Sequence, residues 1–190
     1  MTRIIAGEFG GRRLLTPTGA DTRPTSDRVR EALFSTLGAM LTLDGARFAD
    51  LYAGSGAVGL EALSRGASRV RLVEADPRAA RAARANIAAL GAGAPRSIPV
   101  SLTTVKVERA VAAPPDHEFD AVFADPPYAL ADGDLAAVLA DLAANGWLAA
   151  GGVLVVERSG RSPEPVWPRG VTPDRGRRYG ETTLWYGRRS

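Results

Sequence analysis

The sequence predicts an α/β protein in which helices cover both faces of a mostly parallel sheet. From Ala46 onward, short apolar runs alternate with helical segments, which is the pattern of parallel strands joined by crossover helices. The segments with the strongest chemical signals, Asp50–Gly59, Glu74 and Asp125–Tyr128, all fall where a strand is expected to end. Sheets of this kind bind ligands at the carboxyl ends of their strands, so these positions agree with the predicted fold.

Length and composition indicate one soluble globular domain. The chain has 190 residues, of which 45% are hydrophobic and 24% charged, and this suits a single core with a small appendage. It contains no cysteine, which excludes disulfides and thiolate metal sites and fits a reducing cytoplasm. The N-terminus lacks the apolar core of a signal peptide, and no apolar run is long enough to cross a membrane. We expect a cytoplasmic protein, monomeric by default, with no metal and no membrane partner.

The first residues predict a small extension ahead of the main domain. Two short β-prone runs around a glycine pair within residues 3–15 indicate a hairpin. After a polar loop, Thr25 or Ser26 is placed to cap a helix. We therefore assign residues 1–24 to a hairpin extension and residues 25–190 to the main domain.

The main domain is predicted to alternate strands and helices along the rest of the chain. Apolar periodicity and helix caps place these elements. Ahead of the last strand, Pro163, Pro165, Pro168 and Pro173 indicate an irregular loop or a short edge strand. The expected strands cover residues 47–52, 69–74, 98–107, 119–124, 152–157 and 182–186, and the expected helices cover residues 58–65, 77–90 and 134–144.

The positive charge of the chain lies mainly at its two ends. The formal net charge is +3, and basic ends around a more neutral centre suggest an anionic partner larger than a metabolite. A solvated basic surface explains the same distribution equally well. The terminal arginines are Arg3, Arg12, Arg13, Arg23, Arg28 and Arg30 near the N-terminus, and Arg158, Arg161, Arg169, Arg175, Arg177, Arg178, Arg188 and Arg189 near the C-terminus.

A glycine-rich segment follows the first predicted strand of the sheet. Gly54, Gly56 and Gly59 form a G-x-G-x-x-G pattern, and Glu74 ends the next strand. Gly54 and Gly56 allow a ligand to approach the backbone closely, and the Glu74 carboxylate can accept hydrogen bonds from two ribose hydroxyls. This combination indicates an adenosine-type cofactor; the alternative is a tight strand-to-helix turn beside a surface acid.

Asp50, just before the glycines, bears on which cofactor binds. A dinucleotide needs its pyrophosphate at the helix N-terminus, where an acid would repel it. S-adenosylmethionine has no phosphate, and its α-ammonium needs an acceptor such as the Asp50 carboxylate. Asp50 therefore favours S-adenosylmethionine.

Asp125-Pro126-Pro127-Tyr128 directly follows the apolar run Phe119–Ala124. An exocyclic amine on a nucleobase is a poor nucleophile because its lone pair is delocalised into the ring. The Asp125 carboxylate and the Pro126 carbonyl can each accept a hydrogen bond from one N–H group of this amine. Proline holds the backbone rigid without adding a donor. Tyr128 can stack on the base. The segment predicts methyl transfer to a planar amine; a merely rigid turn is the alternative.

These segments resemble a known family. Asp50–Gly56 together with Asp125–Tyr128 resembles the pattern of class I amino-methyltransferases. The N-terminal stretches narrow the resemblance to the RsmD family, the bacterial 16S rRNA guanine-N2 methyltransferases. It runs from Arg3 to about Glu157, and it rests on Arg3–Gly7, Gly11–Leu14, Thr22–Phe34 and the C-terminal Tyr179–Thr182.

The resemblance implies a class I, Rossmann-like fold: a mostly parallel seven-stranded sheet with helices on both faces, preceded by a small hairpin and helix. It implies S-adenosylmethionine as cofactor and 16S rRNA of the small ribosomal subunit as partner. It assigns Asp125, Pro126, Pro127 and Tyr128 to catalysis, and Asp50, Tyr52, Ala53, Gly54, Ser55, Gly56, Glu74, Ala75 and Val107 to the cofactor. The RNA contacts it implies are Arg3, Arg12, Arg13, Arg23, Thr25, Arg28 and Arg30.

One position departs from the family pattern. Many relatives have Asp or Asn after the third strand, near the adenine, where this chain has Val107 or Glu108. The sequence therefore leaves open whether backbone groups hold the adenine instead. Elsewhere we expect His117 to lie in an exposed loop and Asn86 to serve structure.

Three other functions share some of these features. A DNA adenine-N6 or cytosine-N4 methyltransferase also uses Asp-Pro-Pro-Tyr, but it usually carries a separate target-reading domain. A nicotinamide-dependent oxidoreductase would share the glycine pattern and Glu74, yet it gives no reason for Asp125–Tyr128. A non-catalytic RNA-binding factor would use the arginines alone.

Overall fold

A computed structural model describes residues 2–17, 26–92 and 98–190 of the chain. The strands are β1 (Thr2–Arg3), β2 (Arg13–Leu14), β3 (Arg47–Leu51), β4 (Arg69–Val73), β5 (Val100–Thr103), β6 (Phe119–Ala124), β7 (Leu148–Ser159), β8 (Val171–Tyr179) and β9 (Thr182–Arg189). The helices are α1 (Asp27–Met40), α2 (Ala57–Ser64), α3 (Pro77–Gly91), α4 (Val107–Val111) and α5 (Asp132–Ala144). Ser26 caps α1 by accepting a hydrogen bond from the Val29 N–H, as the sequence predicts.

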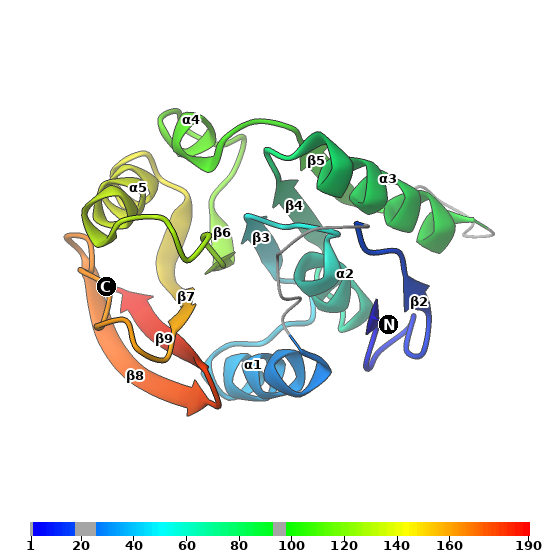
Figure 1. Ribbon diagram of the computed structural model, residues 1–190, viewed down its shortest axis with the longest axis horizontal. Helices are drawn as coiled ribbons and strands as arrows, with labels where there is room; N and C mark the ends of the chain where they lie inside the picture. Colours follow the sequence, from blue (N-terminus) through cyan, green and yellow to red (C-terminus); the bar gives the residue numbers. More distant parts are fainter. Residues whose placement is uncertain (1, 18–25, 93–97) are drawn as a thin grey trace.

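The main sheet has seven strands in the order β5-β4-β3-β6-β7-β9-β8 (Figure 1). The strands from β5 to β7 run parallel, and β9 and β8 are added antiparallel at one edge. The chain moves outward from β3 through β4 to β5 and then returns to β6 on the other side of β3. The predicted mostly parallel sheet is confirmed, and its strand order reverses between β3 and β6, where such sheets bind ligands.

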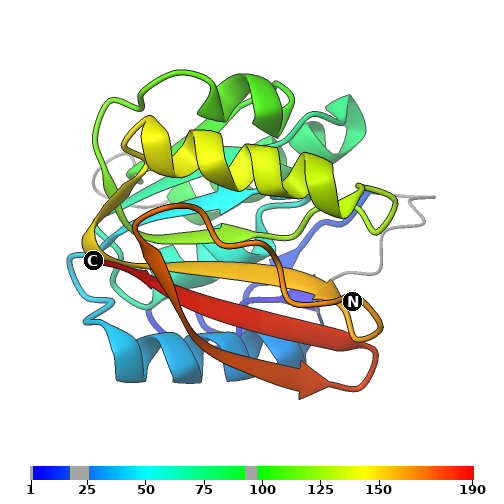
Figure 2. The same cartoon turned by 90° about the vertical axis from the view of Figure 1, so that its left-hand side faces the viewer.

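Two apolar clusters form the core, one on each face of the sheet. The first joins α1, α2 and α3 to residues such as Phe48 and Phe123. The second joins α4 and α5 to residues such as Leu51 and Val122. Neighbours such as Val122 and Phe123 fall in different clusters because successive strand residues point to opposite faces. Figure 2 shows α5 and α1 on opposite faces of the sheet.

Two elements differ from the prediction. Residues 98–107 were expected to form one strand, but only Val100–Thr103 pairs with β4. The chain then turns, and Val107 and Val111 bury one face of the short helix α4, because their spacing of four residues suits a helix as well as a strand.

The proline-containing segment ends in a strand that is longer than predicted. β8 is nine residues long and lies at the edge of the sheet, with an irregularity in register between Pro173 and Arg175. An edge strand tolerates proline because its missing N–H can face solvent. The predicted irregular loop is confirmed over residues 160–170, and so is the edge position of β8, but this edge strand is not short as predicted.

The N-terminal hairpin pairs Thr2 with Leu14 and Arg3 with Arg13. Its apolar residues Ile4, Phe9 and Leu14 are buried in the first core cluster. The extension therefore shares the core of the main domain, and the boundary predicted at residue 24 lies outside the described residues. None of the helices described combines the length and apolar character needed to cross a bilayer.

Candidate active site at the carboxyl edge of the sheet

The glycine loop and the Asp-Pro-Pro-Tyr segment leave the sheet side by side. Leu51, the last residue of β3, pairs with Ala124, the last residue of β6. The next residue after β6, Asp125, donates its backbone N–H to the Leu51 carbonyl over 3.3 Å. The two segments that the sequence predicts to carry the chemistry therefore meet where the strand order reverses.

The loop after β3 is held in a strained and well-bonded conformation. Tyr52 has φ = 61°, a left-handed value that is unfavourable for a residue other than glycine and is often found at functional sites. The Ala53 N–H donates to the Val73 carbonyl, and the Gly56 N–H donates to the Ala53 carbonyl. The Tyr52 hydroxyl is buried and has no hydrogen-bond partner among the described residues, and burial raises the pKa of this phenol.

The three glycines of the loop have different roles. A Cβ on Gly56 would lie 2.9 Å from a Leu72 methyl carbon, and a Cβ on Gly59 would lie 2.3 Å from the other. These two glycines let α2 pack closely against β4. For Gly54, with φ = +56°, no described residue other than its two chain neighbours comes within 4 Å of the Cβ position. Of the two glycines predicted to approach a ligand, Gly54 thus has open space beside it, whereas Gly56 packs against the core.

Asp50 stabilises the loop from within the protein. Its side chain is 1% exposed, and Oδ2 accepts a hydrogen bond of 2.8 Å from the Gly59 N–H. Burial raises the pKa of Asp50 to about 7; the Gly59 hydrogen bond opposes this shift and the charge of Glu74 adds to it. The carboxylate thus ties the start of α2 to β3, and its predicted contact with an α-ammonium stays a prediction.

Glu74 lies against the same loop from the neighbouring strand. Its Oε2 accepts from the Gly54 N–H over 2.7 Å, and its Oε1 accepts from the Asp76 N–H over 2.7 Å. The acid predicted to bind a ribose is therefore directly beside Gly54, the glycine with open space. Ala75 is exposed next to it, whereas the Val107 side chain is buried in the second core cluster.

The Asp-Pro-Pro-Tyr segment runs from the interior to the surface. Asp125 is half-buried, Pro126 is buried, and Pro127 and Tyr128 are exposed. The Tyr128 ring is unusually open for an aromatic residue at 56% exposed, and its hydroxyl lies 3.4 Å from the Thr182 hydroxyl on β9. An acid near the sheet and an exposed ring beyond it are placed to hold the edge and the face of a planar group.

Arg158 holds the loop that follows this segment. Its guanidinium donates to the Leu130 carbonyl over 3.1 Å and to the Asp132 carboxylate over 2.8 Å, and its side chain is 5% exposed. Arg158 does not belong to a basic C-terminal surface, because it is buried near the end of β7. Nothing in the local pattern signalled this contact, because Leu130 and Asp132 lie far from Arg158 in sequence.

Asn86 on α3 joins the glycine loop to the N-terminal segment. Its side chain is buried, and its amide N–H groups donate to the carbonyls of Ser55 and Leu15, each over 2.9 Å. Its carbonyl accepts from the Leu15 N–H over 2.8 Å. This agrees with the structural role expected for Asn86, and it identifies the loop that Asn86 holds.

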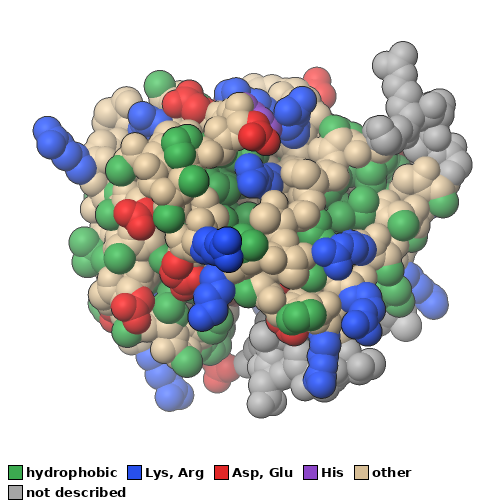
Figure 3. All heavy atoms as spheres, turned by 90° about the horizontal axis from the view of Figure 1, so that it is seen from above, with side chains coloured by type: hydrophobic (Ala, Val, Ile, Leu, Met, Phe, Trp, Pro, Cys, Tyr) green, Lys and Arg blue, Asp and Glu red, His purple; other side chains and the backbone are tan. Residues whose placement is uncertain are grey.

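The predicted RNA contacts divide into exposed, buried and undescribed residues. Arg3, Arg12, Arg13 and Arg28 are exposed, whereas Arg23 and Thr25 lie outside the described residues. Figure 3 shows that arginine and lysine side chains on the face over α4 are scattered among other types. The exposed N-terminal arginines therefore do not continue into one basic surface over that face.

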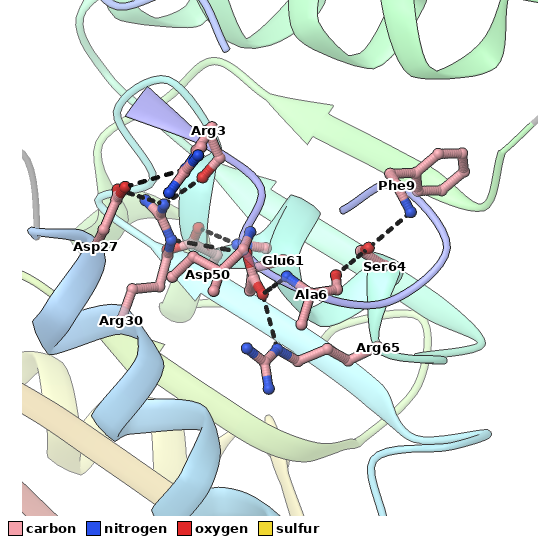
Figure 4. A network of polar contacts seen from close by, with 11 residues as sticks. Arg3, Ala6, Phe9, Asp27, Arg30, Asp50, Glu61, Ser64 and Arg65 are labelled. Carbon is pink, nitrogen blue, oxygen red and sulfur yellow. Dashed lines mark hydrogen bonds and ion pairs between the residues drawn. The ribbon is translucent and has the colours of Figure 1, made fainter. Parts of the chain in front are cut away.

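Arg30 is the exception among these arginines. Its side chain is 0% exposed, and it donates to the Asp27 carboxylate and to the Arg3 carbonyl, with Nε 3.8 Å from Glu61 Oε2 (Figure 4). Burial lowers its pKa, against the charges of Glu61 and Asp27. The prediction that Arg30 contacts RNA is wrong, because Arg30 shares the buried face of α1 with Leu33 and Leu37. Its helical spacing to these residues was the available signal.

Glu61 is the centre of the same network and was not singled out by the sequence. This fully buried carboxylate on α2 accepts from the N–H groups of Ile5 and Ala6, over 2.7 and 3.1 Å. It also binds Arg65 over 2.7 Å (Figure 4). The helix that begins at the glycine loop therefore holds the N-terminal segment through a buried charge.

Comparison with solved structures agrees with this geometry. The structure of yhhF from Escherichia coli is 34% identical, superposes with a TM-score of 0.85, and matches over 99% of this chain and 97% of that chain. A magnesium protoporphyrin IX methyltransferase from Synechocystis, solved with bound S-adenosylmethionine, shares the fold at a TM-score of 0.65 and 14% identity, over 86% and 79% of the two chains. The fold and site define a methyltransferase of the class I type.

Within that class the family is clear. The chain belongs to the family described as conserved hypothetical protein 95, which matches residues 2–188. Ribosomal RNA small subunit methyltransferase D of Escherichia coli is 36% identical over 166 residues, which is 87% of this chain and 79% of that protein. The Haemophilus influenzae protein of the same name is 34% identical over 161 residues, 85% and 80% of the two chains. The resemblance to the RsmD family is confirmed.

Proposed function

We propose that this protein transfers a methyl group from S-adenosylmethionine to the exocyclic N2 of a guanine in 16S rRNA of the small ribosomal subunit. The observation that carries the proposal is the pairing of Leu51 with Ala124, which brings the glycine loop beside Asp125–Tyr128. The names of the relatives support ribosomal RNA of the small subunit as the substrate. The protein acts as a monomer in the cytoplasm and needs no metal.

The cofactor side of the site fits S-adenosylmethionine. Open space beside Gly54 admits a ligand next to the loop backbone, and the adjacent Glu74 carboxylate suits ribose hydroxyls. Backbone groups of the loop, with Ala75 and the start of α4 at Val107, complete this side. When bound, the cofactor supplies an electrophilic methyl group. Asp50 keeps the loop in shape through its hydrogen bond to Gly59.

The substrate side acts by holding and orienting the base. The Asp125 carboxylate and the Pro126 carbonyl accept hydrogen bonds from the two N–H groups of the guanine amine. These contacts draw the nitrogen lone pair out of conjugation with the ring. Tyr128 stacks on the base, as its exposed ring allows. The methylated nitrogen then loses a proton readily to solvent, so no dedicated base is required. Positioning of the amine supplies most of the rate enhancement.

The N-terminal segment and α1 supply contacts to RNA. Arg3, Arg12, Arg13 and Arg28 are exposed there and suit phosphate oxygens, and Arg23 and Thr25 are added on the sequence pattern. A substrate larger than a nucleotide, as naked 16S rRNA and an assembled small subunit both are, fits this spread of contacts.

The test is methyl transfer by an Asp125→Ala variant. Wild-type protein with labelled S-adenosylmethionine should methylate small subunits from a strain that lacks the modification, at a guanine N2 identified by mass spectrometry. Asp125→Ala should lower this rate about a hundredfold or more, the scale seen when a polar group at the reacting atoms is removed. Its affinity for the cofactor, measured by calorimetry, should be unchanged.

Asp141→Ala, which removes an exposed acid on α5, serves as the matched control and should retain full activity. Methylation of DNA oligonucleotides but not of subunits would instead support the DNA methyltransferase. Cofactor binding without transfer to any subunit would contradict the proposed substrate.

A further inference from the structure

A concave surface includes Tyr128, and its other lining residues take no part in the reaction described above. It is a pocket of about 340 Å³ lined by Tyr128, Ser159, Arg161, Arg178 and Glu181. β7 ends at Ser159, which pairs with Thr182 at the start of β9. β8 ends at Tyr179, paired with the same Thr182. The pocket is therefore formed where β7 and the β8–β9 turn reach the edge of the sheet that carries Asp125–Tyr128.

A backbone contact holds Arg178 of this pocket in place although both of its arginines, Arg161 and Arg178, are exposed. The Arg178 Nε donates to the Gly180 carbonyl over 3.0 Å. A Cβ on Gly160 would lie 3.0 Å from that Nε, so glycine is what lets the guanidinium lie against the chain. The Gly160 N–H also donates to the Glu181 carbonyl over 2.6 Å. The strand end and the turn are thus joined directly beneath Arg178.

The charge of the pocket suits an anion. Arg161 and Arg178 bring two guanidinium groups, and Glu181, a residue with an interaction of its own, brings one carboxylate. Guanidinium groups bind phosphate oxygens through paired, charge-assisted hydrogen bonds. Apart from the exposed Tyr128 ring the lining side chains are polar, and all of them except the partly buried Ser159 are exposed, which suits a strand crossing the surface better than an apolar ligand.

We propose that this pocket binds the phosphodiester next to the target base, with Tyr128 between the base and its neighbour. This rests on the proposed function, because it assigns the flanking backbone of the same RNA. In this arrangement the Tyr128 ring stacks on the target base, while Arg161 and Arg178 donate to the phosphate on its other side. The subsite would bind any RNA sequence, because phosphate contacts position the strand and do not read bases.

The test compares the double variant Arg161→Ala/Arg178→Ala with Arg109→Ala/Arg169→Ala, which removes the same charge from exposed positions elsewhere. The first variant should raise the KM for small subunits about tenfold, and kcat should change much less. It should also reduce the slope of log affinity against log salt by about 1 per lost phosphate contact. Cofactor affinity should match the wild type, and the control should change neither KM nor slope by as much.

A third variant tests the chemistry of the ligand. Glu181→Gln removes the carboxylate from the pocket and should tighten subunit binding, since repulsion of the phosphate is lost. Weaker binding by Glu181→Gln would overturn the proposal, because the pocket would then be reading base N–H groups. Equal KM and equal salt slope in the two double variants would also overturn it.

Direct binding of subunits by filter retention separates this subsite from the proposed reaction. Wild-type protein that binds subunits but methylates none of their guanines would contradict the reaction. The subsite would still be judged by the salt slopes of the two double variants in the same binding assay.

Discussion

The two sides of the proposed active site are built in opposite ways. On the cofactor side, acids accept backbone N–H groups: the buried Asp50 from Gly59, the partly buried Glu74 from Gly54, and the buried Glu61, on the helix that follows the glycine loop, from Ile5 and Ala6. On the substrate side, Tyr128, Arg161 and Arg178 are exposed. One side is fixed by buried charge, and the other presents its groups to solvent.

The difference follows from what each side has to bind. A small cofactor is held well by a loop whose shape is set before binding, since less conformational freedom is lost when it binds. An RNA strand on a ribosomal subunit must reach the protein side chains that bind it from outside, so those side chains stay at the protein surface. Substitutions on the cofactor side should therefore change protein stability, and substitutions on the substrate side should change RNA binding.

The largest expected effect on stability comes from disrupting the buried network around Glu61. Glu61→Ala removes the acceptor for two backbone N–H groups and a partner of buried Arg30. Removing one member of a buried ion pair costs about 3–5 kcal/mol. We expect the free energy of unfolding, measured by urea denaturation, to fall by that amount.

Glu31→Ala is the matched control, because Glu31 is exposed on α1. It should change the unfolding free energy by less than about 0.5 kcal/mol. Equal effects of the two substitutions would mean that the network contributes no stability, and the proposed contrast between the two sides would fail.

The next largest expected effect on stability comes from the titration of Asp50, and this effect depends on pH. The folded pKa of about 7 lies above the ordinary value of 3.8, so between these values the folded protein binds more protons than the unfolded chain. Stability must therefore fall as pH rises from about 4 to about 7 and then level off. Converted to free energy, this difference in pKa limits the fall in unfolding free energy to the order of 4 kcal/mol.

Asp50→Asn isolates this contribution, because the amide oxygen can still accept from Gly59 but does not titrate. The unfolding free energy of wild type should decline relative to Asp50→Asn between pH 5 and pH 7. Other titrating groups cancel in this difference. Parallel curves for the two proteins would show that Asp50 titrates as an ordinary exposed acid.

The sequence predicted the parts of this site that depend on local chemistry. The strand-to-helix turn at Gly54 and the rigid segment at Asp125 each need particular residues within a few positions, and β3 and β6 were placed by short apolar runs. That the two segments meet was predictable as well, because both follow strands of one parallel sheet.

The parts that could not be predicted depend on contacts between distant segments. Arg158 belongs to the basic C-terminal stretch, yet it is buried and bonded to Leu130, far along the chain. For Arg30, the helical spacing could have shown its burial, but its partner Glu61 could not be predicted. The different roles of Gly56 and Gly54 depend on where Leu72 lies. Helix α4 was missed because its β-branched residues also suit a strand.

The smallest effect is expected for Arg158, a buried charge on the substrate side. Arg158→Met keeps an apolar stem of similar length but removes the donor to Leu130 and Asp132. Because Asp132 is largely exposed, solvent weakens the ion pair, and we expect a loss of about 1–2 kcal/mol in unfolding free energy. The loop after Tyr128 should also exchange its backbone hydrogens faster, as measured by mass spectrometry.

Arg169→Met, at an exposed position in the β7–β8 connection, is the control and should change neither quantity. Methylation by Arg158→Met should fall with the faster exchange, because the loop that follows Asp125–Tyr128 would no longer be held in one position. A loss as large as that of Glu61→Ala would contradict the contrast. The substrate side would then depend on buried charge as much as the cofactor side does, and the exposed groups would be only its outer layer.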